Sequence, residues 1–106
     1  MRHRGFAGRD AWLAAVEREL AHPAALPILA AKGLDPDVVR TVARIEASHA
    51  SPLGLCSLSA EQLAGATRLP RAAVLRARLA LVELGLEDVV AGPATAGVVH
   101  RELHHE

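Results

Sequence analysis

The first third of the chain has the hydrophobic pattern of amphipathic helices. From Asp10 onward, apolar residues recur with the spacing of one helix face, and a helix is predicted over 10–22 with Asp10 as its N-cap. A second, more apolar segment over 23–32 is followed by Gly33, a residue type common just after helix C-termini. Two consecutive helices are therefore predicted before residue 33.

A third helix is predicted over 35–50. Asp35 is a suitable N-cap, and Pro36 occupies the first helical position, where its missing N–H costs nothing. Valines and Ile45 of this segment are expected to face inward. Together with the preceding helices it should form a helical support over 10–50, with Trp12 in its core.

The pattern after residue 55 is shorter and more varied. The segment 55–59 is compatible with a small strand, and Ser59 with Gln62 forms the capping box of a brief helix. A break at 67–70 separates this helix from a longer one that ends at Gly85. The segment 59–84 is therefore predicted to be a helix-turn-helix.

Two β-prone runs follow the second helix, separated by the turn-rich stretch 91–96. They predict a β-hairpin over 86–102. A short helix, a tight turn, a longer helix and a hairpin occur in the order of a winged helix-turn-helix. The predicted fold is thus mainly α, with an N-terminal helical support and a C-terminal hairpin wing.

The second helix of the motif has distinct inner and outer positions. Its core stripe consists of Val74, Ala77, Leu81 and Leu84. The predicted outer residues are Arg71, Ala72, Leu75 and Arg76, with Arg68 in the turn before them. Arg78 lies near the core stripe and is expected to extend its side chain over apolar surface.

Composition limits the protein to a single small domain. The chain has 106 residues, 51% hydrophobic but with one Trp, one Phe and no Tyr, so its core must be built from Leu, Val and Ala. Twelve basic and twelve acidic residues give a net charge of zero, which provides no overall attraction to a polyanion. A single cysteine, Cys56, and the lack of a long apolar run or secretion signal predict a cytoplasmic protein without a membrane segment.

The run "LSAEQLAGATRLPRAAVLRARLALVELGL" resembles winged-helix regions of bacterial regulators. More narrowly, this run and the upstream "TVARIEASHA" are similar to a helix-turn-helix family of actinobacterial plasmid, phage and integrative-element proteins. The resemblance covers roughly residues 35–92. It implies a transcriptional regulator or a replication-linked protein of a mobile element that binds specific double-stranded DNA.

The arginine cluster of the motif agrees with this function. No acidic residue lies between Arg68 and Arg78, and arginine pairs bidentately with guanine and with phosphate. The predicted DNA-binding residues are Arg68, Arg71, Ala72, Leu75 and Arg76. A flexible basic arm over 1–9 would add contacts from Arg2 and Arg4. The acidic residues of the wing, in contrast, are expected to be repelled by phosphate.

Two other functions compete with DNA binding. Leu75 and Leu79 stand where DNA-binding proteins usually carry polar groups, and with the neutral charge they favour a protein-interaction module on a winged-helix scaffold. A metal-responsive regulator would use His100, His104 and His105, although a solvated tail is the preferred interpretation of these histidines. No motif of an enzyme is present, and no cofactor is expected.

A homodimer is predicted from the balance of charge and apolar surface. Few arginines are available, so one copy can neutralise few phosphates and is expected to bind DNA weakly at physiological salt. A second copy would double the contacts. The apolar side chains for such pairing come from residues 10–50: Trp12, Leu13, Val16, Leu26, Ile28, Leu29, Val38, Val39, Val42 and Ile45. The competing possibility is that they complete one monomeric core and that the chain acts with a larger replication or recombination protein.

Overall fold

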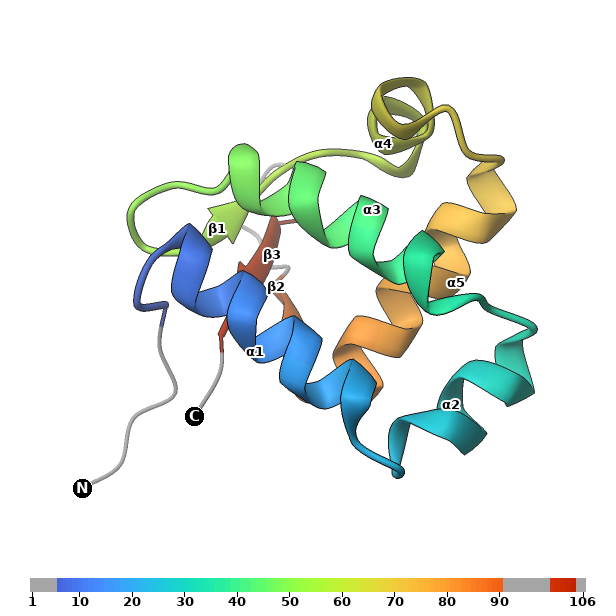
Figure 1. Ribbon diagram of the computed structural model, residues 1–106. Helices are drawn as coiled ribbons and strands as arrows, with labels where there is room; N and C mark the ends of the chain where they lie inside the picture. The colour runs from blue at the N-terminus through green and yellow to red at the C-terminus, as the bar shows by residue number, and fades with distance from the viewer. Residues whose placement is uncertain (1–5, 91–99, 105–106) are drawn as a thin grey trace.

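The computed structural model describes residues 6–90 and 100–104, with only the backbone of His100 (Figure 1). Within these residues the fold is mainly helical and carries a small antiparallel sheet. The helices are α1 (Arg9–Ala21), α2 (Ala25–Lys32), α3 (Pro36–Ser48), α4 (Ala60–Thr67) and α5 (Arg71–Glu83). The strands are β1 (Leu55–Cys56), β2 (Glu87–Val90) and β3 (His100–Leu103). No helix in the described ranges has the length and apolar character needed to cross a bilayer.

The sheet has three strands in the order β1-β3-β2, all antiparallel. The predicted hairpin is confirmed as β2 and β3, with Val89 opposite Arg101. The prediction of a two-stranded wing was incomplete, because β1 adds a third strand in which Leu55 lies opposite Glu102. The resulting order of α3, β1, α4, α5, β2 and β3 is compatible with a winged-helix layout.

Local capping signals determine three helix ends as the sequence predicted. Asp35 Oδ1 accepts a hydrogen bond from the Asp37 amide at 2.8 Å, and Gly33 adopts the left-handed conformation after α2. Ser59 and Gln62 form the reciprocal bonds of a capping box, at 2.8 and 3.1 Å. Each of these signals acts over three residues or fewer, which is why sequence alone reveals it.

The start of α1 differs from the prediction. Gly8, with φ of 108°, is the N-cap, and Asp10 lies in the first turn, so the assignment of Asp10 as the cap was wrong. Phe6 packs against the core, close to Gly54. The predicted arm over 1–9 therefore extends too far, because residues 6–9 belong to the folded domain. Arg2 and Arg4 lie outside the described residues.

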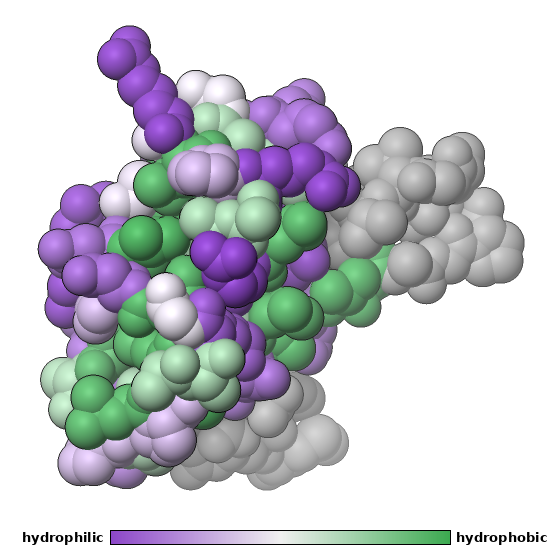
Figure 2. All heavy atoms as spheres, turned by 90° about the vertical axis from the view of Figure 1, so that its right-hand side faces the viewer, coloured by the Kyte–Doolittle hydropathy of each residue, from purple (hydrophilic) through white to green (hydrophobic). Residues whose placement is uncertain are grey.

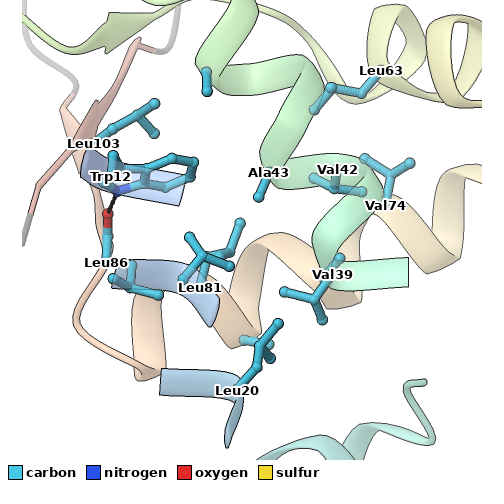
Figure 3. Packing of buried hydrophobic residues seen from close by; sticks show 14 of the residues in the cluster. Trp12, Leu20, Val39, Val42, Ala43, Leu63, Val74, Leu81, Leu86 and Leu103 are labelled. Carbon is cyan, nitrogen blue, oxygen red and sulfur yellow. Dashed lines mark hydrogen bonds between the residues drawn. The ribbon is translucent and has the colours of Figure 1, made fainter. Parts of the chain in front are cut away.

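One core joins the N-terminal helices to α4 and α5 (Figure 3). α3 lies in its middle and packs against α1, α4 and α5 (Figure 1). The largest buried apolar side chains come from every part of the chain: Trp12, Val16, Val39, Val42, Leu63, Val74, Leu81, Leu86 and Leu103. The Trp12 indole N–H donates to the Leu86 carbonyl at 2.9 Å, which ties α1 to the start of the wing (Figure 3).

The core buries most of the apolar surface on which the dimer prediction was based. Trp12, Val39 and Val42, which the prediction assigned to a pairing surface, are completely buried within one chain. Of the residues chosen for that surface, Leu26 is the one with a large exposure, 67%. Residues 10–50 thus complete the monomeric core, which was the competing interpretation of their apolar content.

Candidate nucleic-acid interface

In the turn between α4 and α5, Arg68 adopts the left-handed backbone conformation, which is unusual for a residue other than glycine. Arg68 has φ of 61° and ends α4 as its C-cap, with its amide donating to the Ala64 carbonyl at 2.9 Å. Thr67 stabilises the same turn, because its hydroxyl donates to the Leu63 carbonyl and accepts from the Leu69 amide. The exposed Arg68 side chain therefore projects from a well-bonded turn.

The outer positions predicted for α5 are on the surface. Arg71, Ala72, Leu75 and Arg76 are exposed, and so is Leu79. These five residues are called the α5 outer face below. The predicted core stripe faces the opposite side, where Val74, Ala77 and Leu81 are completely buried. The pattern of the sequence therefore gave the correct orientation of this helix.

Arg71 is the arginine of the α5 outer face that has an ion-pair partner. Its Nε lies 2.6 Å from Glu61 Oε1 on α4, and both side chains are more than half exposed. The pKa of Glu61 is lowered, chiefly by a hydrogen bond from its own backbone amide and then by Arg71. Because the pair is exposed, water and salt weaken it, so Arg71 can exchange Glu61 for another anion at small cost.

Arg68 and Arg76 differ from Arg71 in this respect. Neither guanidinium has an ion-pair or hydrogen-bond partner within residues 6–90 and 100–104. Their positive charges are therefore available to a ligand. Arg68 lies in the turn before α5, and Arg76 lies in the second turn of this helix. Figure 2 views the side of the molecule that lies at the right of Figure 1 and shows hydrophobic patches bordered by strongly hydrophilic side chains.

Arg78 does not extend over the surface as predicted. Its side chain is buried, with Nε 2.9 Å from Glu46 Oε2 on α3 and Nη2 donating to the Leu58 carbonyl at 2.7 Å. A buried guanidinium requires such partners because desolvation is costly. The sequence contained a signal for the burial of both residues, though not for their pairing: Glu46 shares the inward face of α3 with Val39 and Val42, and Arg78 shares the core side of α5.

Two acidic residues of the β2–β3 hairpin, Glu87 and Asp88, have side-chain partners within the protein. Glu87 is completely buried and accepts a hydrogen bond from Arg101 across the hairpin, while Asp88 Oδ2 lies 2.9 Å from His104 Nε2. Burial raises the pKa of Glu87 well above its ordinary value, with a further contribution from Glu46. The Glu87 carboxyl thus does not face solvent, which removes it from the acidic residues that were expected to repel phosphate.

The histidine tail also differs from the preferred prediction. His104 is buried and its amide donates to the Leu86 carbonyl, so the assignment of this residue to a solvated tail was wrong. His105 and the His100 side chain lie outside the described residues. Within the described part of the chain, no three His, Cys, Asp or Glu side chains are arranged to hold a metal ion. Cys56 is buried.

Comparison with known proteins adds no family assignment. No protein-family model, curated protein or solved structure matches this chain. Function therefore has to be inferred from the geometry of the α5 outer face and of the β2–β3 hairpin.

Proposed function

We propose that this protein binds double-stranded DNA through the α5 outer face. The observation that supports this most strongly is the arrangement of Arg68, Arg71 and Arg76 on the exposed side of a helix-turn-helix. In such motifs the second helix enters the major groove and its N-terminal residues reach base edges. Arg71 and Arg76 would contact bases or phosphates, and Arg68 would contact the backbone.

The neutral composition of the chain is less of an obstacle than its total charge implies. Internal pairs such as Glu46 with Arg78 remove one acidic and one basic group together and leave this balance unchanged, whereas the buried Glu87 carboxyl adds little negative charge to the surface of the hairpin. Local charge near the bound phosphates matters more than the sum over the chain, because salt screens charges beyond about 10 Å. The hairpin of β2 and β3 would then lie beside the DNA backbone without strong repulsion.

The biological role proposed for this binding is that of a transcriptional regulator or a replication-linked protein of a mobile element. Pairing of two copies remains part of the proposal, since few arginines are available per chain and binding by one copy would be sensitive to salt. Arg2 and Arg4 would add contacts from the N-terminal arm. Light scattering of the protein, with and without bound DNA, measures whether the complex contains one copy or two.

A titration of arginine variants tests the proposal. Genomic fragments that bind at moderate salt are first selected, and the best fragment is then titrated by gel shift with the wild type, Arg71→Ala and Arg76→Ala. Removal of a base contact is expected to cost about 1–3 kcal/mol at its own base pair, whereas removal of a phosphate contact weakens all sequences equally.

Arg44→Ala is the matched control for this titration. Arg44 is an exposed arginine on α3 beside the start of α1, so its removal changes the net charge by the same amount at a different surface. The control is expected to bind as the wild type does. Equal affinities for the wild type, Arg71→Ala and Arg76→Ala would refute the assignment of α5.

A protein-docking function is the second candidate, and the exposed leucines of α5 favour it. Leu75 and Leu79 are 36% and 56% exposed, an uncommon position for two large apolar side chains. In this case the partner would be a larger replication or recombination protein. Selection that enriches no DNA fragment over the background would favour this function over the first.

A further inference from the structure

The α5 outer face has an apolar middle and basic edges. Each residue turns the helix by about 100°. Around the helix axis, the α5 outer face therefore spans about 140°, in the angular order Arg71, Leu75, Leu79, Ala72 and Arg76. The arginines stand at the two edges of this arc, and the leucines and Ala72 lie between them. The exposed fractions of Leu75 and Leu79, 36% and 56%, show that neither is covered by the rest of the described chain.

This arrangement selects a particular chemical group in the major groove. A helix in the groove directs its edges toward the two phosphate walls and its middle toward the base edges on the groove floor. Most groups on that floor are hydrogen-bond donors or acceptors, which a leucine cannot satisfy. The apolar group there is the C5-methyl of thymine, and 5-methylcytosine presents a methyl at the same ring position.

We propose that Leu75 and Leu79 read C5-methyl groups of pyrimidines in the major groove. This inference rests on the proposed DNA-binding function and specifies its ligand. Ala72 is small enough to let the helix approach the base edges closely, while Arg71 and Arg76 hold it by contacts at the edges of the groove. The helix rises about 6 Å between Leu75 and Leu79, and base pairs stack about 3.4 Å apart, so the two methyl groups lie no more than about two base-pair steps apart.

Removal of single methyl groups from the DNA tests this directly. In a selected fragment, each thymine is replaced in turn by uracil, which differs by the C5-methyl alone, and Kd is measured by fluorescence anisotropy. Loss of one buried methyl contact corresponds to about a fourfold increase in Kd. The increase is expected at one or two neighbouring positions and not elsewhere in the site.

Protein variants connect the effect to the two leucines. Leu75→Ala and Leu79→Ala are expected to bind more weakly and to lose sensitivity to uracil, each at its own position. Leu26→Ala is the matched control, since Leu26 is an exposed leucine on α2, and it should keep the sensitivity of the wild type. Both leucines of α5 are partly solvated, so the variants should fold, and the emission of buried Trp12 verifies this.

A second set of DNA fragments separates the two sources of the methyl group. Each cytosine of the site is replaced by 5-methylcytosine within its own pair with guanine. Tighter binding of the methylated site assigns the contact to 5-methylcytosine, and weaker binding after replacement of thymine by uracil assigns it to thymine. Either result supports the inference.

Two outcomes would overturn it. A protein that binds its fragment with unchanged Kd across all uracil and 5-methylcytosine replacements would still bind DNA, but not by reading methyl groups. A wild-type protein that binds no DNA fragment would refute the proposed function and this inference together.

Discussion

Replacement of Glu87 by glutamine should make the stability of the protein less dependent on pH. Glu87 is buried and faces charged groups from two elements, Glu46 on α3 and Arg101 on β3. Burial is the main cause of its raised pKa, and the neighbouring carboxylate of Glu46 adds to it. Neutral glutamine has nearly the same shape as the protonated carboxyl and no proton to lose.

The sign of the effect follows from proton binding. Above the ordinary pKa of about 4.5, the unfolded chain has released the Glu87 proton while the folded protein still holds it. The free energy of unfolding contributed by this group therefore decreases as pH rises, by about 1.4 kcal/mol per pH unit, until the raised pKa is passed. Relative to the wild type, Glu87→Gln should thus become progressively more stable as pH increases within that window.

Urea unfolding measures this difference. Trp12 is the single tryptophan and is completely buried, so its emission reports unfolding of the core without a label. The wild type and Glu87→Gln are compared at intervals from pH 4.5 to pH 8, and the difference in unfolding free energy is plotted against pH. Titrating groups that do not interact with Glu87 are common to both proteins and cancel. A difference that stays constant over this range would refute the argument that Glu87 holds a proton in the folded state.

Two further predictions concern the arginines of the helix-turn-helix. Arg78→Met should destabilise the protein by about 3–5 kcal/mol in the same unfolding assay, because it leaves the buried Glu46 carboxylate without its partner. The double variant with Glu46→Gln should recover most of this loss, and a double variant as unstable as the single one would contradict the explanation. Arg68→Gly should stabilise the fold by about 1 kcal/mol in thermal unfolding, because glycine adopts the left-handed conformation without strain. The same variant should bind DNA more weakly, and a decrease in melting temperature would argue against strain at this position.

The local elements of this protein could be predicted from the sequence because their signals act over a few residues. The Asp35–Pro36 start of α3, the Ser59–Gln62 capping box and Gly33 after α2 each satisfy backbone groups that lie within one turn. The orientation of α5 was also predictable, since the period of a helix separates Val74 and its neighbours from the outer arginines.

The tertiary structure determined features that join distant parts of the chain. Two residues of β1 have no periodicity, and they form a strand because β3 lies beside them. Capping preference alone favoured Asp10, but the packing of Phe6 near Gly54 accompanies a helix that begins one residue earlier. The apolar residues of α1 and α3 looked available for a second copy until the fold placed α4, α5 and the wing against them.

The charged residues show the same division. Sequence placed Arg71 and Arg76 on the surface correctly, because a helical period is enough to separate outside from inside. It could not decide that Arg78 pairs with Glu46, or that Glu87 turns inward to Arg101, because the cost of burying a charge depends on which partner the fold brings within hydrogen-bond distance. Local hydrogen bonding and helical periodicity depend on neighbouring residues and can therefore be predicted from the sequence. The desolvation and pairing of charged side chains depend on the whole fold.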